Sequence, residues 1–507
     1  MDPAAIALRG LAASAPLVVA VLGTALRLRG WVTAVLALAA GAVAAVLLAP
    51  AALPGLPATF PAALPTILEV CGIILGGLLL SRILDAAGAQ RRIAAWCEAA
   101  SSHPSSSALL VVLGIEAFSE TVTGFGVGIA IAVPILRHLG FGALSSATMA
   151  LCGLVVTVWG GLSPGSLVAA HLAGLDLTEV GLATAWTVWP ASLLAGLVVV
   201  WIAHPDRRPG HLRLVEGAAA GLVLAGGIVL ANSLVGTPLA GALGGLAAIA
   251  ALLVRFRLGG DRTPAFDASM RRAVAPYALL LGALLPLNLW LRIAGETGPI
   301  RYLASPAAWL VIVALASLAW FGMTRAEARR AAAGAFAAWR PIALVTLLYM
   351  TLGWLLTESG LSRDMAGALA LLGPASLALA PALGALGGFL TGSNTGANAM
   401  LTSSVAELSH LAGVSALGPV GAASQAGAIG TMCAPARVAL AAGVAAAPPA
   451  DAGGVAESPA PHPEASDEPD EPDAAELGRR LIPRMLAFNV VVAVALGLIA
   501  WLGATPA

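Results

Sequence analysis

The scarcity of charge is the feature that most limits what this chain can fold into. Of its 507 residues, 59% are hydrophobic and only 10% are Asp, Glu, Lys or Arg. A soluble domain carries about 25% charged residues, so this chain cannot cover a large water-exposed surface. Lipid must contact most of it, and we predict an all-α polytopic membrane protein. The zero net charge gives no electrostatic reason to expect a nucleic-acid partner.

Apolar stretches of spanning length recur along the chain. A membrane-crossing helix needs roughly 20 apolar residues, and this window predicts about 12 transmembrane helices. Two of them, 143–174 and 414–447, are too long for one crossing and contain Gly-Pro breaks. Two further apolar segments, 106–136 and 374–406, have polar residues and glycines in their middles, and we predict that they are re-entrant hairpins. The other predicted spans are 11–26, 31–49, 62–80, 183–203, 214–234, 238–254, 274–293, 305–323, 341–357 and 482–503.

The arginines set the orientation in the membrane, since every basic residue of the chain is Arg. With the N-terminus outside, 21 of the 26 arginines fall in cytoplasmic loops, as the positive-inside rule requires. This count holds only if both hairpins return to the side from which they start. The hairpin prediction and the arginine distribution therefore support each other.

One order of parts occurs twice in the chain. A span, an amphipathic arm, a hairpin and a broken span follow one another in 62–203 and again in 341–447. The arginine-derived orientation turns the second set upside down, which predicts an inverted-repeat transporter fold. Broken helices free backbone groups that can bind a solute or an ion. The remaining regions are N-terminal helices at 1–61, connecting helices at 204–340, an acidic cytoplasmic loop predicted to be disordered at 448–478, and a C-terminal helix at 479–507.

Two glycine-rich polar motifs stand out in the hairpin segments, EAFSETVTGFG at 116–126 and GFLTGSNTGANA at 388–399. They resemble signatures of the L-lactate permease family, and weaker similarity extends from the first span to the last. The resemblance implies proton-coupled uptake of a 2-hydroxy monocarboxylate such as L-lactate or glycolate, paired hairpins and elevator-like movement. The family usually carries Asp at the position of Asn394 and Lys at the position of Thr431, and the break at 158–166 is shorter in this chain.

Three acids in apolar segments are candidates for proton coupling. Charge inside a bilayer is costly and usually functional, and a carboxyl group removed from water holds a proton more readily. We predict that Glu120, just before the first hairpin tip, is the coupling carboxyl; the alternative is a structural hydrogen bond. Glu116 lies four residues earlier, on the same helical face. Glu69, within span 62–80, either takes part in coupling or links two helices.

Substrate binding is predicted at the hairpin tips and the broken spans. Arg437 follows the second break, and its planar guanidinium fits a carboxylate; the alternative is an ion pair with Glu120 or Glu69. Glycines permit close backbone approach, while hydroxyl and amide groups suit a carboxylate or a 2-hydroxyl. The predicted substrate-binding residues are Gly124, Gly126, Ser163, Gly392, Ser393, Asn394, Thr395, Gly396, Asn398, Gln425 and Arg437.

These features predict a secondary active transporter of the bacterial cytoplasmic (inner) membrane, a proton-coupled symporter of a small carboxylate. A sodium-coupled carrier of another organic anion is the alternative. A channel or an intramembrane enzyme is the less favoured class. An enzyme would need a nucleophile–base pair or a metal cluster in the membrane, and the sequence pattern offers neither. The cysteines lack metal-ligand and redox spacing, so we expect no metal and no cofactor. A homodimer is a candidate assembly for the carrier.

Overall fold

The computed structural model describes residues 2–100, 103–204, 208–261, 264–295, 299–447 and 473–503. Eight helices in this part of the chain are long and apolar enough to cross a membrane, or up to 13 spans if each bent pair counts as one. The chain is thus an all-helical protein with the hydrophobic lengths of a polytopic membrane protein. Most of the predicted acidic loop, 448–472, lies outside the described residues.

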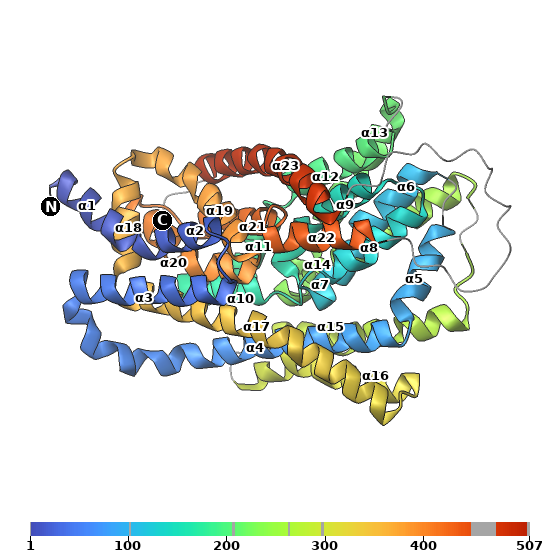
Figure 1. Ribbon diagram of the computed structural model, residues 1–507, viewed down its shortest axis with the longest axis horizontal. Helices are drawn as coiled ribbons and strands as arrows, with labels where there is room; N and C mark the ends of the chain where they lie inside the picture. The colour runs from blue at the N-terminus through green and yellow to red at the C-terminus, as the bar shows by residue number, and fades with distance from the viewer. Residues whose placement is uncertain are drawn as a thin grey trace.

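The first part of the chain forms the helices coloured blue to cyan-green in Figure 1, which begin at the N-terminus and include the first predicted repeat. Their bounds are α1 (Pro3–Ala13), α2 (Ala15–Ala25), α3 (Gly30–Leu48), η1 (Pro50–Gly55), α4 (Leu56–Ala86), α5 (Ala89–Glu98), α6 (Pro104–Leu109), η2 (Leu110–Glu116), α7 (Ala117–Thr123), α8 (Val127–His138), α9 (Ala143–Gly153), η3 (Leu154–Trp159), α10 (Pro164–Ala173), α11 (Leu177–Ala185) and α12 (Trp189–Ile202).

The second part forms the connecting helices, the second predicted repeat and the C-terminal helix. Their bounds are α13 (His211–Leu234), α14 (Thr237–Leu258), α15 (Ala268–Ala294), η4 (Pro299–Ala304), α16 (Pro306–Phe321), α17 (Arg325–Glu358), α18 (Leu361–Ala370), η5 (Gly373–Leu379), α19 (Ala380–Thr391), α20 (Asn394–Leu411), α21 (Leu417–Thr431), α22 (Pro435–Ala446) and α23 (Ala474–Leu502).

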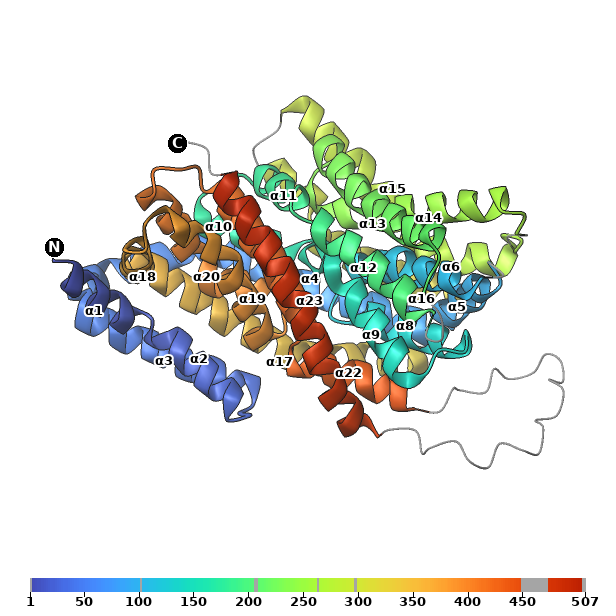
Figure 2. The same ribbon diagram turned by 90° about the horizontal axis from the view of Figure 1, so that it is seen from above.

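The two predicted repeats meet in the middle of the molecule. Helix α20 of the second repeat packs against α10 of the first, and α21 packs against η3 and α11. The long helices α4 and α17 pack together along one side of this centre, with α16 against α4. In Figure 2, α23 runs obliquely across the molecule, with α1–α3 on one side and α13–α15 on the other.

Both predicted broken spans are bent where the sequence has its Gly-Pro breaks. The bend between 143–159 and α10 is 46°, and the bend between α21 and α22 is 41°. The two predicted hairpins are helix–turn–helix units, with turns at 124–126 and 392–393. The first arm, Pro104–Thr123, has 20 residues, and 94% of an 18-residue apolar window within it is buried inside the protein. Because its length alone would suffice for a crossing, its re-entrant path stays a prediction.

Several helix boundaries differ from the predicted ones. Some predicted spans are bent, and capping residues start two helices earlier than their apolar residues do. The spans predicted at 11–26 and 183–203 fall within longer bent pairs, α1 with α2 at 46° and α11 with α12 at 43°. Helix α17 begins at Arg325, well before the predicted 341, because Thr324 and Glu327 form a reciprocal capping box. Helix α23 begins at Ala474, inside the segment predicted as a loop, because Asp473 caps it by accepting a hydrogen bond from Glu476 N at 2.7 Å.

The crossing of α19 and α21 brings two backbones into contact. A β-carbon on Gly384 would overlap the carbonyl oxygen of Ala423, and one on Gly388 would overlap that of Gly427. Small residues allow helices to approach this closely inside a membrane. These glycines therefore hold the first arm of the second helix–turn–helix against the second broken span.

We expect Gly384→Ala to destabilise the protein by about 1–3 kcal/mol, because the added methyl group overpacks this crossing. The matched control is Gly443→Ala in α22, where a β-carbon would meet nothing within 4 Å. That substitution should be neutral or stabilising, since Ala is the better helix former. The midpoint of thermal unfolding of the purified proteins measures both. Equal midpoints for the two variants would contradict the close crossing.

Candidate functional site

The first turn, at 124–126, holds a buried carboxylate. Glu120 is fully buried near the end of α7, and its carboxylate accepts hydrogen bonds from Gly126 N at 3.0 Å and Gly128 N at 3.2 Å. These N–H groups lie at the N-terminus of α8, where the helix dipole and unpaired donors favour an anion. The turn is possible because Gly124 and Gly126 both have positive φ, at 73° and 88°.

Arg437 joins the first turn to the second. It lies in the first turn of α22, 7% exposed, with Nη1 3.8 Å from Oε1 of Glu120. Its Nε donates to the carbonyl oxygen of Gly392 at 3.4 Å. A β-carbon on Gly126 would overlap the guanidinium, so only Gly permits this approach. The ion pair that the sequence left open as an alternative role for Arg437 is therefore present in the structure.

The guanidinium of Arg437 has unused hydrogen-bonding capacity. Among the described residues, its buried Nη1 has no hydrogen-bond partner, although it lies at ion-pair distance from Glu120. A guanidinium carries five N–H donors in a fixed planar fork. A planar anion reaching this point would find a donor already directed at it.

Glu116 is a second buried acid, one helical turn before Glu120. It is fully buried, and neither carboxylate oxygen has a hydrogen-bond partner among the described residues. Its carboxyl group packs so closely on Gly153 of α9 that a β-carbon there would overlap it. The residue ends η2, a π-helical segment, and such segments are frequent at functional sites. Sequence reasoning found Glu116 but not this change in helix type.

The second turn, at 392–393, leads into a neutral polar cluster. Asn394 Nδ2 donates to the carbonyl of Ser424 at 2.7 Å. Asn398 Nδ2 lies within hydrogen-bond distance of Gly165 O, Asn394 Oδ1 and Ser424 Oγ, at 3.0, 3.1 and 3.0 Å. The cluster therefore connects α20 to both broken spans, at Gly165 in α10 and at Ser424 in α21.

The remaining second-turn residues mainly shape the backbone. Ser393 caps α20 by accepting a hydrogen bond from Gly396 N at 3.4 Å, and its own carbonyl accepts one from Thr391 Oγ1 at 2.8 Å. Thr395 is buried beside them. Gln425, in the middle of α21, donates to Val155 O at 3.0 Å, and its side-chain oxygen has no hydrogen-bond partner among the described residues.

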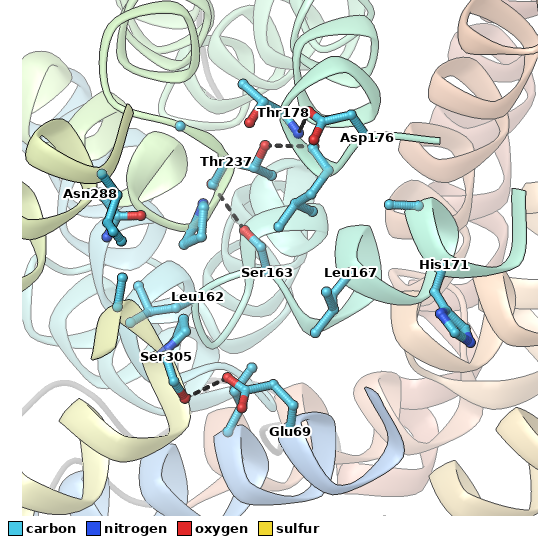
Figure 3. A pocket seen from close by; sticks show the side chains of 18 of the residues that line it. Glu69, Leu162, Ser163, Leu167, His171, Asp176, Thr178, Thr237, Asn288 and Ser305 are labelled. Carbon is cyan, nitrogen blue, oxygen red and sulfur yellow. Dashed lines mark hydrogen bonds between the residues drawn. The ribbon is translucent and has the colours of Figure 1, made fainter. Parts of the chain in front are cut away.

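An open pocket of about 660 Å³ contains two other predicted site residues. Figure 3 shows Ser163, at the first break, directed at Thr237, whose carbonyl oxygen accepts its hydrogen bond at 3.2 Å. Below it, Glu69 of α4 accepts a hydrogen bond from Ser305 Oγ at 2.7 Å. Glu69 thereby connects α4 to the N-terminus of α16, which is the helix link that the sequence left open. Arg292 of α15 also lines this pocket.

The break loop lies between the pocket and the buried Glu120. Gly161 N donates to the carbonyl oxygen of Glu120 at 3.0 Å, and Leu162 N donates to that of Thr121 at 2.7 Å. The strained residues Leu162 and Ser163, with φ of 64° and 75°, face the pocket. A movement of this loop would therefore change both the lining of the pocket and the backbone hydrogen bonds at the end of α7.

Eight of the fourteen predicted residues fall into three groups. Glu120, Gly126, Gly392 and Arg437 come together at the two turns, Asn394 and Asn398 form the neutral cluster, and Glu69 and Ser163 line the pocket.

Sequence reasoning missed Ser424, Thr237 and Arg292. Ser424 had a usable signal, because it is a polar residue beside Gln425 in an apolar span. Thr237 and Arg292 had none, since only the tertiary fold brings them to the first break.

The family model and the two relatives compared with this chain carry the same description, L-lactate permease. The family model described as L-lactate permease matches residues 9–274 and 294–448. The chain is 27% identical over 400 residues to an L-lactate permease of Salmonella typhimurium, covering 66% of this chain and 71% of the relative. It is 24% identical over 323 residues to an L-lactate permease of Streptococcus iniae, covering 58% and 67%.

Solved transporter structures are more distant. The chain is similar to the YdaH transporter of Alcanivorax borkumensis, with a TM-score of 0.47 and 15% identity over 89% of each chain. The family assignment rests on the sequence match, which extends over most of the chain and includes both turns and both broken spans. The chain belongs to the L-lactate permease family.

Proposed function

We propose that this permease carries a small 2-hydroxy monocarboxylate, L-lactate or glycolate, together with a proton across a bacterial cytoplasmic membrane. Its family membership and its many apolar helices make it a multi-pass membrane transporter rather than an enzyme. Both relatives compared with it are bacterial proteins named L-lactate permease. The observation that carries the proposal is the buried pair of Glu120 and Arg437 between the two turns.

Arg437 is the group best suited to bind the substrate carboxylate. A guanidinium pairs with a carboxylate through two parallel N–H···O bonds, and Nη1 of Arg437 has no such bond within the described residues. The site is almost fully buried, so its one cation balances one carboxylate at a time. A substrate carboxylate would therefore replace Glu120 as the partner of Arg437.

This competition supplies a physical reason for proton coupling. If Glu120 takes up a proton, its negative charge is lost and Arg437 becomes an uncompensated buried charge, which is strongly unfavourable. An arriving anion restores the balance. Proton and anion thus enter together, because either one alone leaves the site charged, and the expected stoichiometry is one proton for each monocarboxylate.

Glu116 is suited to hold the proton before or after Glu120. An ionised carboxylate without hydrogen bonds is costly in a buried site. Both carboxylate oxygens of Glu116 are buried and have no hydrogen-bond partner among the described residues. A proton bound to Glu116 would remove this cost. Its position one helical turn from Glu120 allows the two acids to exchange a proton as the site rearranges.

The open pocket offers the substrate a route to this site. The break loop 160–163, whose Leu162 and Ser163 line the pocket, lies between the pocket and Glu120. Movement of the loop would connect the pocket to Arg437, and the amides of Asn394 and Asn398 would then offer hydrogen bonds to a 2-hydroxyl group. The elevator-like movement implied by the family resemblance is one way to produce that shift.

A sodium-coupled carrier remains the second candidate, favoured by the neutral cluster. Oxygens of Asn394, Gly165 and Ser424 lie within hydrogen-bond distance of the Asn398 amide nitrogen, and oxygen atoms are the ligands of hard cations. Labelled lactate uptake into proteoliposomes, driven separately by a pH gradient and by a sodium gradient, distinguishes the two. We expect the pH gradient to drive accumulation without sodium.

We expect Glu120→Gln to abolish accumulation driven by a pH gradient while exchange of internal for external lactate continues. The amide keeps the shape of the side chain but cannot release a proton. Glu358→Gln, at an exposed carboxyl at the end of α17, is the matched control and should accumulate lactate normally. Accumulation by Glu120→Gln at the level of this control would remove Glu120 from the coupling mechanism.

We expect Arg437→Lys to raise the lactate KM by about 10- to 100-fold, because it loses a hydrogen bond to a charged group worth about 1.5–3 kcal/mol. Arg437→Gln should in addition destabilise the fold by about 3–5 kcal/mol by leaving Glu120 unpaired. The double variant Glu120→Gln/Arg437→Gln should recover stability but not transport. An unchanged KM in a stable Arg437→Lys protein would exclude Arg437 as the anion-binding group.

A further inference from the structure

A second pocket lies between α12 and α23, away from the transport site. Its volume is about 800 Å³, and it is lined by the end of α12, the first half of α23 and the start of α9. Neither the two turns nor the open pocket of Figure 3 contributes to it. We call it the basic pocket, for the side chains described next.

The polar end of the basic pocket carries positive charge. Arg208, Arg484 and His204 line it, and no Asp or Glu is among its described lining residues. Arg208 is exposed, and Arg484 makes one long hydrogen bond from Nη1 to Thr148 Oγ1 at 3.4 Å. The His204 ring is held by Nδ1, 2.8 Å from the carbonyl oxygen of Val200. The pocket therefore offers cations that are not neutralised by a carboxylate lining it.

The rest of the basic pocket is apolar and faces outward. Leu194 and Val198 of α12 form one wall, and Phe488 and Val491 of α23 form the other. Val491 is 58% exposed, and so is Trp201 beside the basic end. An apolar groove with a positively charged end fits a ligand that has an anionic head and a hydrocarbon tail.

The depth of the basic pocket in the membrane indicates which kind of ligand can reach it. Arg208 lies between α12 and α13, and the beginning of α23 carries Arg479, Arg480 and Arg484. The positive-inside rule places these arginines on the cytoplasmic side. Trp is enriched at the membrane–water interface, which agrees with the exposed Trp201. The charged end therefore lies at the height of the headgroups, and the apolar groove extends toward the hydrocarbon.

We propose that the basic pocket binds an anionic phospholipid of the cytoplasmic leaflet. Arg208 and Arg484 pair with its phosphate, and its acyl chains lie between α12 and α23. Basic pockets between transmembrane helices on the cytoplasmic side bind such headgroups. Because α23 also packs on α9, α21 and α22, a lipid bound here stabilises the position of α23 against the first and second broken spans.

The test is thermal unfolding of the full-length protein in neutral detergent with added phospholipid. Phosphatidylglycerol should raise the unfolding midpoint in a saturable manner, as ligand binding to the folded state requires, while phosphatidylcholine should not. Arg208→Gln and Arg208→Gln/Arg484→Gln should lose most of the shift. The control Arg325→Gln/Arg329→Gln, at two exposed arginines of α17 that do not line the basic pocket, should keep it.

The single variant Arg208→Gln keeps the test decisive if the double variant fails to fold, because Arg208 is exposed. Native mass spectrometry should show phosphatidylglycerol retained by the wild type and lost from the Arg208→Gln protein. Equal shifts with both lipids, or a full shift in Arg208→Gln, would overturn the proposal. A comparable shift with inorganic phosphate alone would also overturn it, since the ligand would then be a free anion.

Discussion

The cost of leaving backbone groups and charges unpaired in a buried, water-poor interior governs the centre of this protein. The first turn interrupts a helix and exposes N–H groups at the start of α8, and the carboxylate of Glu120 accepts hydrogen bonds from two of them. That carboxylate in turn needs a cation, which Arg437 supplies from the other half of the chain. One break in the backbone thus leads, through charge balance, to a contact between the two predicted repeats.

The same balance relates structure to transport. A buried site with one cation and one carboxylate tolerates exchange of that carboxylate for another, but not the loss of either charge alone. Arg437 also contacts the carbonyl of Gly392, so a change of its partner is transmitted to both turns. The break loop at Gly161, hydrogen-bonded to the backbone of Glu120, extends this connection to the edge of the open pocket. In the mechanism that we propose, binding, proton uptake and movement of the turns therefore share a single group of contacts.

Sequence reasoning found the parts of the fold that depend on local composition. Both turns and both bends were predicted from glycines, prolines and polar residues within apolar segments. Glu120 and Arg437 were predicted as site residues because each is a charged residue in such a segment. The start of α17 was not predicted, because the spans were located by their apolar residues. The first part of α17 is Ala-rich and polar, and it forms a helix that begins at a capping box. The pairing of Glu69 with Ser305 joins residues 236 positions apart, and no local pattern encodes such a contact.

Charge balance also offers a physical reason for two of the departures that the family resemblance implies. The family resemblance associates Asp with position 394 and Lys with position 431, whereas this chain has Asn and Thr. Asn394 lies against Gly427 of α21, one helical turn before Thr431, and Thr431 satisfies its hydroxyl locally on Ala428 O. Exchanging only the acid would leave a buried cation, and exchanging only the base would leave a buried anion. Replacing both removes one charge of each sign, so the neutral cluster keeps the same net charge and Arg437 stays as the cation facing the two turns.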